Sequence, residues 1–298
     1  MEMLVLSHVE KHFGEKQVLK DVTFSVPEHS VFGFAGQNGA GKTTAMKMVL
    51  GLLPAGGGEI FVNGMQVRYG NTPTNRFVGY LPDVPEFYSY MTPAEYLCFC
   101  GEIAGMPAKE IKNRCEELLC LVGLEKEHHR IKGFSRGMKQ RLGVAQALFS
   151  RPKLIICDEP TSALDPAGRK ELLDVLVSSK EQATVLFSTH ILSDVERICD
   201  EIAVLHEGKI VLQGALEEVR KERKAAATEL ETERAEDAGK LLSAFPFLKA
   251  QGRGRLLLEE TERLPEILHF LADADMPMLR IERREATLED LYMEVVGK

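Results

Sequence analysis

The sequence contains no apolar run that approaches the roughly 20 residues needed to cross a bilayer. Its beginning, MEMLVLSHVEKHF, has only a short apolar stretch before a charged residue, so we expect no secretory signal. We therefore predict a cytoplasmic protein, and any work at a membrane would need a partner that is embedded there.

An excess of positive charge is also missing. The chain has 37 lysines and arginines against 45 aspartates and glutamates, which gives a formal net charge of −8. This balance argues against a protein that binds along nucleic-acid backbones, although it leaves a local basic patch open. No nucleic-acid partner is expected.

Cysteine pairs with the spacing of a metal or redox site are absent. The six cysteines include Cys98 and Cys100, and the single residue between these two is a poor spacing for a metal site. Most of the cysteines lie in apolar helix or strand patterns. We interpret them as small buried side chains in a reducing compartment.

The sequence does have the composition of a globular protein, with 44% hydrophobic and 28% charged residues. Alternating apolar and polar residues predict strands in the first part, including an antiparallel β part at the N-terminus. A helical pattern begins at about residue 88 and indicates a helical insert at about 88–150. Strands and helices then alternate, which favours an α/β fold with a mostly parallel sheet flanked by helices.

The composition changes near Glu217, where EEVRKERKAAATELETERAED is dense in charge. This pattern indicates a solvated helix or linker that leads into a strand. Short strand and helix patterns alternate after it. We predict a larger domain at residues 1–216 and a small α+β domain at 217–298, for which a ferredoxin-like arrangement is the candidate.

The stretch GQNGAGKTT fits the pattern G-x-x-x-x-G-K-[ST], and it follows a strand pattern and opens a helix pattern. Glycines let backbone N–H groups turn toward an anion, and a helix N-terminus adds positive potential. We expect Lys42 to contact the β- and γ-phosphates of a nucleotide and Thr43 to bind Mg²⁺ through its hydroxyl. The predicted nucleotide-binding residues of this loop are Gly36, Gln37, Asn38, Gly39, Ala40, Gly41, Lys42, Thr43 and Thr44.

A buried strand pattern, LIICDEP, ends in two carboxylates. Asp158 is placed to hold Mg²⁺, directly or through water. Glu159 follows it and is the candidate general base for an attacking water molecule. The alternative, that Asp-Glu-Pro only ends a strand, is weakened by the phosphate-binding loop upstream.

His190 closes the next strand pattern, ATVLFSTH. That strand follows the Asp158 strand by one helix, so a parallel sheet would bring both strand ends to the edge where ligands bind. We expect His190 to hydrogen-bond the γ-phosphate and to orient water. A purely structural role is the alternative for a lone histidine after an apolar strand.

Together these segments resemble the ATP-binding cassette (ABC) ATPases over roughly residues 1–216. GQNGAGKT resembles the Walker A motif, LIICDEP the Walker B motif, SALD the D-loop and FSRGMKQRL the signature motif, while His190 stands in the position of the switch histidine. The resemblance implies a P-loop NTPase core, ATP hydrolysis as the activity, and ATP and Mg²⁺ as cofactors.

In this family two cassettes pair head to tail, and each ATP lies between the P-loop of one and the signature motif of the other. The resemblance therefore implies contacts to the nucleotide of a second cassette, either a second copy or a paralogue, from Ser135, Arg136, Gly137 and Asp165. Ser135 can cap its own helix at the same time. Phe13 stands where the family has an aromatic residue that stacks on adenine, and a core phenylalanine is the alternative.

Two positions depart from the family pattern. Arg136 stands in the signature motif where the family in general has glycine, although lysine or arginine is usual in a subclass of bacterial exporters. Asp83, in GYLPDVPEF, stands where the Q-loop has glutamine or sometimes glutamate. Aspartate is shorter and cannot donate a hydrogen bond when ionised, so we expect it to meet Mg²⁺ through water.

The single cassette, the SRGMKQ segment and the end TLEDLYMEVVGK resemble the ATPase subunit of bacterial exporters whose permease is a separate integral membrane chain. This resemblance implies a peripheral location on the inner face of the cell membrane and a permease-docking surface at residues 84–92 with the following helix. The aromatics of PEFYSYM either belong to that surface or pack under the loop.

Residues 217–298 are expected to steady the cassette dimer or to regulate it. Two other functions stay open. One is a soluble ABC ATPase that acts in translation, DNA maintenance or cofactor assembly. The other is a P-loop kinase, which would leave the signature motif unexplained.

Overall fold

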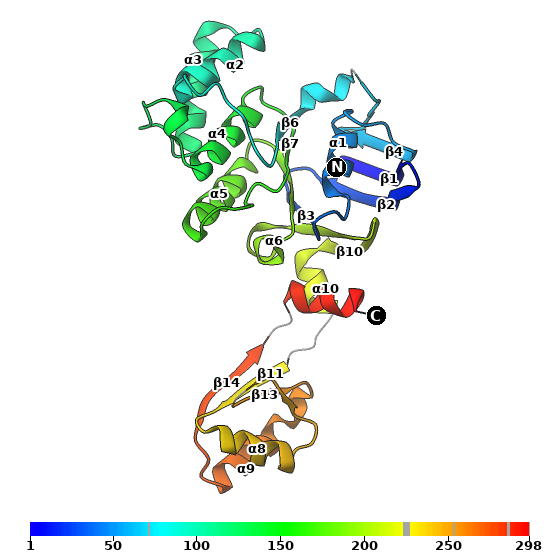
Figure 1. The fold of residues 1–298 in the computed structure, drawn as a ribbon, viewed down its shortest axis with the longest axis vertical. Coiled ribbons are helices and arrows are strands. Elements are labelled where there is room, and N and C mark those ends of the chain that lie inside the picture. Colours follow the sequence, from blue (N-terminus) through cyan, green and yellow to red (C-terminus); the bar gives the residue numbers. More distant parts are fainter. Residues whose placement is uncertain (71, 223–226, 253, 285–286, 298) are drawn as a thin grey trace. The chain divides into compact units, whose positions relative to one another are not determined.

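The chain forms two compact units, Met1–Leu216 (unit 1) and Glu217–Lys298 (unit 2), in a computed structural model (Figure 1). Four residues of the charge-dense segment, 223–226, lie outside the described part. The structure describes residues 1–70, 72–222, 227–252, 254–284 and 287–297.

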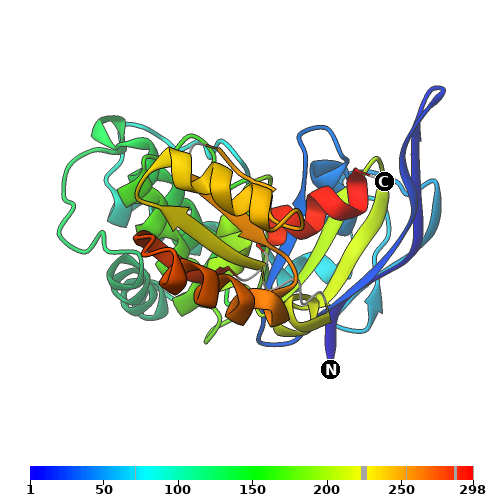
Figure 2. The same cartoon turned by 90° about the horizontal axis from the view of Figure 1, so that it is seen from below.

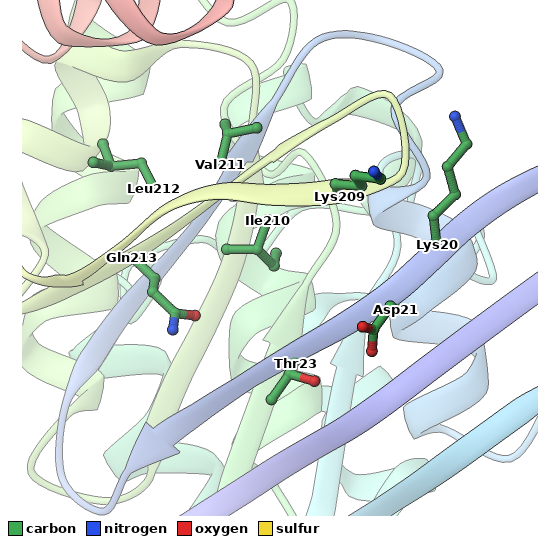
Figure 3. A pocket seen from close by; sticks show the side chains of 8 residues that line it. All are labelled: Lys20, Asp21, Thr23, Lys209, Ile210, Val211, Leu212 and Gln213. Atoms are coloured by element: carbon green, nitrogen blue, oxygen red, sulfur yellow. The ribbon is translucent and has the colours of Figure 1, made fainter.

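Unit 1 begins with an antiparallel sheet of order β2-β1-β4-β5. Figure 2 shows β1 and β2 as a long hairpin. A tight turn at Asn63 and Gly64, both with positive φ, connects the last two strands and pairs Val62 with Met65. The strands are β1 (Glu2–Phe13), β2 (Lys16–Pro27), β4 (Gly57–Val62) and β5 (Met65–Gln66).

A second sheet of unit 1 has the order β10-β9-β3-β8-β7-β6 and is parallel except for its edge strand β10. Every residue of β3, β7 and β8 is buried, as expected for parallel strands covered on both faces. The strands are β3 (Val31–Gly36), β6 (Val78–Leu81), β7 (Leu154–Cys157), β8 (Thr184–Thr189), β9 (Glu201–His206) and β10 (Lys209–Ala215). Since β3, β7 and β8 run in parallel, their carboxyl ends meet at one edge of the sheet.

Helices flank this sheet and form the insert (Figure 1). The helix after Thr92 begins with a capping box, in which the Thr92 and Glu95 side chains each bond to the other residue's backbone N–H. These helices are α1 (Lys42–Val49), α2 (Pro93–Ile103), α3 (Ala108–Leu121), α4 (Arg136–Leu148), α5 (Pro166–Ser179) and α6 (Leu192–Ile198). The helix α7 (Leu216–Glu222) begins at the last residue of unit 1, and its other residues belong to unit 2. Short 3-10 turns are η1 (Pro73–Phe77) and η2 (Ile131–Gly133).

One hydrophobic core joins the two sheets of unit 1 to α1. Phe24 on β2 stacks against Phe32 and Phe34 on β3, with ring centroids 5.5 and 5.1 Å apart. Met46 and Met48 of α1 lie in the same cluster. The strand that leads into the phosphate-binding loop is therefore fixed by packing on both sides, which makes a rigid base for the loop.

Unit 2 has the order β11-α8-β12-β13-α9-β14, followed by α10. Its strands form an antiparallel sheet of order β12-β13-β11-β14, which is the ferredoxin-like βαββαβ arrangement. Both α8 and α9 cover the same face of that sheet (Figures 1 and 2), where Leu230, Leu241, Leu256 and Ile267 share a separate core. The bounds are β11 (Ala227–Thr232), α8 (Ala235–Ala244), β12 (Lys249–Ala250), β13 (Arg255–Leu258), η3 (Thr261–Arg263), α9 (Leu264–Asp273), β14 (Met278–Arg284) and α10 (Leu288–Val296).

The cysteines are all free thiols. Cys115 and Cys157 are buried as expected, whereas Cys120 is exposed, so the expectation of buried cysteines is wrong for that residue. Burial and the nearby Asp158 charge raise the pKa of Cys157 to about 12, which keeps this thiol protonated. In the described parts of the chain, no helix combines the length and the hydropathy needed to span a bilayer.

Candidate nucleotide-binding site

The predicted phosphate-binding loop connects β3 directly to α1. Gly36, Gly39 and Gly41 all have positive φ, at 156°, 82° and 114°. A Cβ atom on Gly36 would collide with the backbone oxygen of Leu205, and one on Gly41 would lie 2.7 Å from Leu19 Cδ2. A Cβ on Gly39 would meet nothing within 4 Å. Gly36 is thus required by its close backbone contact, and Gly41 by its positive φ together with tight surroundings. Gly39 lies at the open side of the loop.

Lys42 is the first residue of α1, and its side chain is only 5% exposed. Its ammonium donates to the carbonyl oxygens of Gly36 at 2.6 Å and Gln37 at 3.2 Å, and it lies 2.9 Å from Glu159 Oε1. An ammonium has three N–H donors, and these three acceptors occupy them all. A phosphate that binds Lys42 must therefore replace one of the three.

Thr43 and Asp158 meet at the edge of the sheet. The Thr43 hydroxyl donates to Asp158 Oδ1 at 3.1 Å, and the Ser188 hydroxyl donates to the same oxygen at 2.7 Å. The Asp158 backbone N–H donates to Leu81 on the neighbouring strand. Asp158 is only 3% exposed, so its carboxylate is held in one orientation by hydroxyls from two other elements.

Glu159 lies between Lys42 and His190. Its Oε2 is 2.6 Å from His190 Nδ1, while its Oε1 faces Lys42. The Glu159 backbone has positive φ, at 47°, and its N–H donates to the hydroxyl of Ser188. The predicted general base and the predicted switch histidine are therefore in direct contact, at the ends of adjacent parallel strands.

The residues at this edge have the chemistry that a nucleotide and Mg²⁺ require. The loop offers backbone N–H groups at a helix N-terminus, and Lys42 offers an ammonium. Thr43 and Asp158 offer two oxygen ligands, which suits an ion that keeps its other positions for phosphate oxygens and water. The described residues contain no group of three or more His, Cys, Asp or Glu side chains placed as a metal site, so a cage made only of protein ligands is not what they form.

The signature segment lines a pocket of about 260 Å³ together with the D-loop. Ser135 caps α4 and accepts from the Met138 N–H at 3.2 Å, so the N-cap prediction is confirmed. Gly137 and Asp165 line the same pocket, Asp165 as the residue before α5. A Cβ on Gly137 would meet its nearest neighbours, among them Gly168 Cα and Leu164 Cδ2, at 4.0 Å, so a small side chain fits there without a clash.

Two buried groups that the sequence analysis did not single out hold the loop between β7 and α5. Asp194, at 3% exposure, accepts from the Thr161 hydroxyl at 2.8 Å and from Arg169 Nε at 2.6 Å. Ser188 supports both Asp158 and Glu159, as described above. The sequence signal for Ser188 is a serine within the otherwise apolar strand before His190, and Asp194 has no comparable signal.

Asp83 lies two residues beyond β6. Its carboxylate accepts hydrogen bonds from one residue of the signature segment and one residue of the D-loop. Arg136 Nη2 is 3.4 Å from Asp83 Oδ1, and the Ser162 hydroxyl also donates to that oxygen. Neither Thr43 nor Asp158 is among the described hydrogen-bond partners of this carboxylate. Burial, followed by the charges of Asp158, Cys157 and Asp83, raises the pKa of nearby Tyr80 to about 12.

Phe13 ends β1 and is 49% exposed, so the alternative of a core phenylalanine is wrong. Lys11 Nζ lies 5.2 Å from the centroid of its ring. An exposed ring leaves a face for stacking on a nucleotide base.

The aromatic loop at residues 84–92 is partly exposed and partly packed. Tyr88 and Tyr90 are 50% and 63% exposed, whereas Phe87 packs edge-on against Tyr96 at 5.1 Å. Beside them is a mainly apolar pocket of about 400 Å³. It is lined by Tyr88, Tyr96, Phe99, Cys100, Ile103, Ala104, Gln146, Phe149 and Ser150.

Comparison with known proteins gives the family. A family model described as "ABC transporter" matches residues 19–162. A Bacillus subtilis (strain 168) ABC transporter ATP-binding protein, YxlF, is 37% identical over 304 residues, which cover 99% of this chain and 99% of YxlF. This chain belongs to the ABC transporter ATP-binding proteins. Members of this family bind and hydrolyse ATP, so the chain is an ATPase.

Other ABC proteins are similar to this chain in sequence or in fold over most of their length. The bacitracin transport ATP-binding protein BcrA of Enterococcus faecalis is 33% identical over 297 residues, which cover 97% of this chain and 95% of BcrA. A solved ATP-binding subunit of an ABC transporter is 33% identical with a TM-score of 0.65, and covers 74% of this chain and 92% of its own. The ADP conformation of the ATP-binding cassette MJ1267 is 25% identical with a TM-score of 0.65, and covers 73% and 92%. The predicted α/β P-loop ATPase fold is thereby confirmed.

Proposed function

We propose that this chain is the ATP-hydrolysing subunit of a bacterial ABC exporter, and that it drives a separate membrane permease through ATP-dependent pairing of two cassettes. The observation that carries the proposal is the position of Glu159 between Lys42 and His190, beside the Thr43–Asp158 pair. This arrangement combines a phosphate-binding cation, a base and a pair of Mg²⁺ ligands within one sheet edge.

The chain's own residues have separate roles in this proposal. The loop's N–H groups and Lys42 bind the β- and γ-phosphates, and Phe13 stacks on the base. Phosphate binding draws Lys42 away from Glu159, which frees the carboxylate to accept a proton from water. His190 holds Oε2 of that carboxylate and orients it toward the γ-phosphate. Thr43 and Asp158 would hold Mg²⁺, which would supply positive charge beside the phosphates.

The second half of the site comes from another cassette. Ser135, Gly137 and Asp165 line a pocket with the D-loop rather than with the P-loop. We assign this pocket to the γ-phosphate of a partner cassette, which the N-terminus of α4 faces. ABC ATP-binding proteins dimerise as a family, and this chain pairs either with itself or with a paralogue.

The exporter assignment is supported by two relatives, one named for bacitracin transport and one for linearmycin resistance. BcrA of Enterococcus faecalis matches nearly the full length, including unit 2, and is named for bacitracin transport. The linearmycin resistance ATP-binding protein LnrL of Bacillus subtilis (strain 168) is 35% identical over 214 residues. We assign the permease contact to Tyr88, Tyr90 and the pocket beside them, at the inner face of the membrane. Unit 2 then steadies or regulates the pair of cassettes.

The test is isolation of the tagged full-length chain from its own cells in mild detergent. We expect an integral membrane protein to co-purify with it in stoichiometric amount. A Tyr88→Ala/Tyr90→Ala double variant should no longer co-purify with that protein but should still hydrolyse ATP. Leu52→Ala, at an exposed apolar residue outside the loop, is the matched control. If ribosomes or nucleic acid accompany the chain instead, the exporter proposal gives way to the soluble alternative.

A further inference from the structure

Asp83 and Arg136, which the resemblance to ABC ATPases marks as departures from the general motifs, contact each other. Arg136 Nη2 lies 3.4 Å from Asp83 Oδ1. The sequence distance between them is large, yet a residue that adds a negative charge and a residue that adds a positive charge meet in the fold. Each departure therefore offsets the charge that the other introduces.

Ser162 of the loop between β7 and α5 completes the contact. Its hydroxyl donates to Asp83 Oδ1 and accepts from Arg136 Nη2 at 3.2 Å. We call Asp83, Arg136 and Ser162 the Asp83 triad. Its members come from three segments: the loop after β6, the first turn of α4, and the start of the D-loop.

The backbone of the Asp83 loop is also tied to α4. Gln140 is fully buried and lies one helical turn beyond Arg136, on the same face of α4. Its Nε2 donates to the Asp83 carbonyl oxygen at 2.6 Å. Asp83 is thus bound to α4 by its main chain and by its side chain, and this double attachment sets the direction of its carboxylate.

The Arg136 side chain is held at one end only. The described bonds of its guanidinium use Nη2, and the same side chain lines the pocket that it shares with Ser135 and Gly137. A guanidinium has further N–H donors on Nε and Nη1, in a planar fork that suits phosphate oxygens. Fixing Nη2 therefore orients the remaining donors without using them.

From this geometry we infer that Asp83 is a positioning residue, which acts through Arg136 rather than on Mg²⁺. The triad orients the guanidinium toward the γ-phosphate of the partner cassette's nucleotide and joins the Asp83 loop to the signature segment and the D-loop. This inference rests on the proposed function of the signature pocket. It replaces the expectation that Asp83 meets Mg²⁺ through water.

The first test is a double-mutant cycle with Asp83→Asn and Arg136→Gln. Asparagine keeps an oxygen that accepts from Ser162 and removes only the charge. We expect D83N to raise the ATP concentration for half-maximal hydrolysis roughly two- to fivefold, the range of a partly exposed ion pair. In the R136Q background D83N should have no further effect. The Mg²⁺ concentration for half-maximal activity should stay unchanged in D83N.

The matched control is Asp174→Asn. Asp174 Oδ1 lies 3.0 Å from Arg197 Nη2. The exposed fractions of these two side chains are similar to those of Asp83 and Arg136. This variant removes an equivalent ion pair away from the site, and we expect it to leave both half-maximal concentrations unchanged. A D83N effect that persists in the R136Q background, or a raised Mg²⁺ requirement, overturns the inference in favour of a Mg²⁺ role.

A second measurement does not depend on ATP turnover. Hydrogen–deuterium exchange of the nucleotide-free full chain should show faster exchange in D83N at the first turn of α4 and around Ser162. R136Q should give the same increase, and D83N/R136Q no more than either variant alone. Unchanged exchange in D83N overturns the triad even if the ATPase is active. If wild-type protein does not hydrolyse ATP, the proposed function fails. The exchange experiment still shows whether Asp83 and Arg136 together hold the start of α4 and the segment around Ser162.

Discussion

His190 Nδ1 lies 2.6 Å from Glu159 Oε2 at the carboxyl edge of the parallel sheet. The contact joins the ends of β7 and β8, which pair in register up to Cys157 and Phe187. A base that is held by a second side chain keeps the orientation it needs for proton transfer.

Replacing His190 with alanine should lower the rate of ATP hydrolysis roughly 10²-fold, because the Glu159 carboxylate loses the partner that orients it. The measurement is phosphate release at saturating ATP. His8→Ala is the control, since His8 Nδ1 also lies 2.6 Å from a carboxylate, that of Asp21, at an exposed position. Equal rates in H190A and H8A would contradict the orienting role.

Ser188→Ala should destabilise the protein by about 1–3 kcal/mol, because it removes a hydroxyl that serves two groups of the site. Asp158 Oδ1 loses a donor and the Glu159 N–H loses its acceptor. Urea unfolding followed by circular dichroism measures the change. Ser178→Ala, at an exposed serine whose hydroxyl donates to Asp174 O on α5, should cost far less. We also expect slower ATP hydrolysis in S188A but not in S178A.

Phe13→Ala should weaken ATP binding without much loss of stability, because the ring is 49% exposed and adds little to the core. Stacking of a base on an aromatic ring is worth about 1–3 kcal/mol, so Kd should rise roughly 5- to 150-fold. Calorimetric titration with ATP measures it. Phe13→Tyr should restore binding, and Leu52→Ala should leave Kd unchanged. Unaltered binding in F13A would remove the stacking role.

Gly36 and Gly39, two of the three glycines in the phosphate-binding loop, should respond differently to alanine. In Gly36→Ala the new Cβ collides with Leu205 O, so we expect a loss of about 3 kcal/mol or more and poor yields of folded protein. In Gly39→Ala the Cβ meets open space, and only the backbone strain at φ 82° remains, about 1–2 kcal/mol. Urea unfolding of both variants tests the difference, and equal losses would contradict this account of the loop.

Much of this architecture follows from local sequence patterns. The Thr92 capping box, the Ser135 cap and the two-residue turn at Glu207 and Gly208 depend on neighbours within a few residues, and all three are present. The strand–loop–helix around GQNGAGKTT also contains its own signals. Each of the strands β3, β7 and β8 is a run of apolar residues in the sequence. The run of β3 precedes the phosphate-binding loop, that of β7 precedes Asp158 and that of β8 precedes His190, and these runs favour a buried parallel sheet.

Other features depend on contacts between distant segments and could not be predicted. The carboxylate of Asp83 was expected near Mg²⁺, but Arg136 and Ser162 bind it instead. No sequence pattern near Asp194 indicates that its carboxylate accepts hydrogen bonds from Thr161 and Arg169. Exposure of Phe13 depends on how β1 ends relative to its neighbours, and alternation along one strand does not decide it.

The central claim is tested most directly by phosphate release from the purified full-length chain with ATP and Mg²⁺, compared between wild type and Glu159→Gln. Glutamine keeps the size of the side chain, and its amide oxygen can still accept from Lys42, but it cannot act as the base. We predict that the rate falls roughly 10²- to 10⁴-fold, while ATP still binds and the ATP-bound dimer accumulates. If E159Q releases phosphate as fast as wild type, Glu159 is not the general base, and the proposed mechanism is wrong.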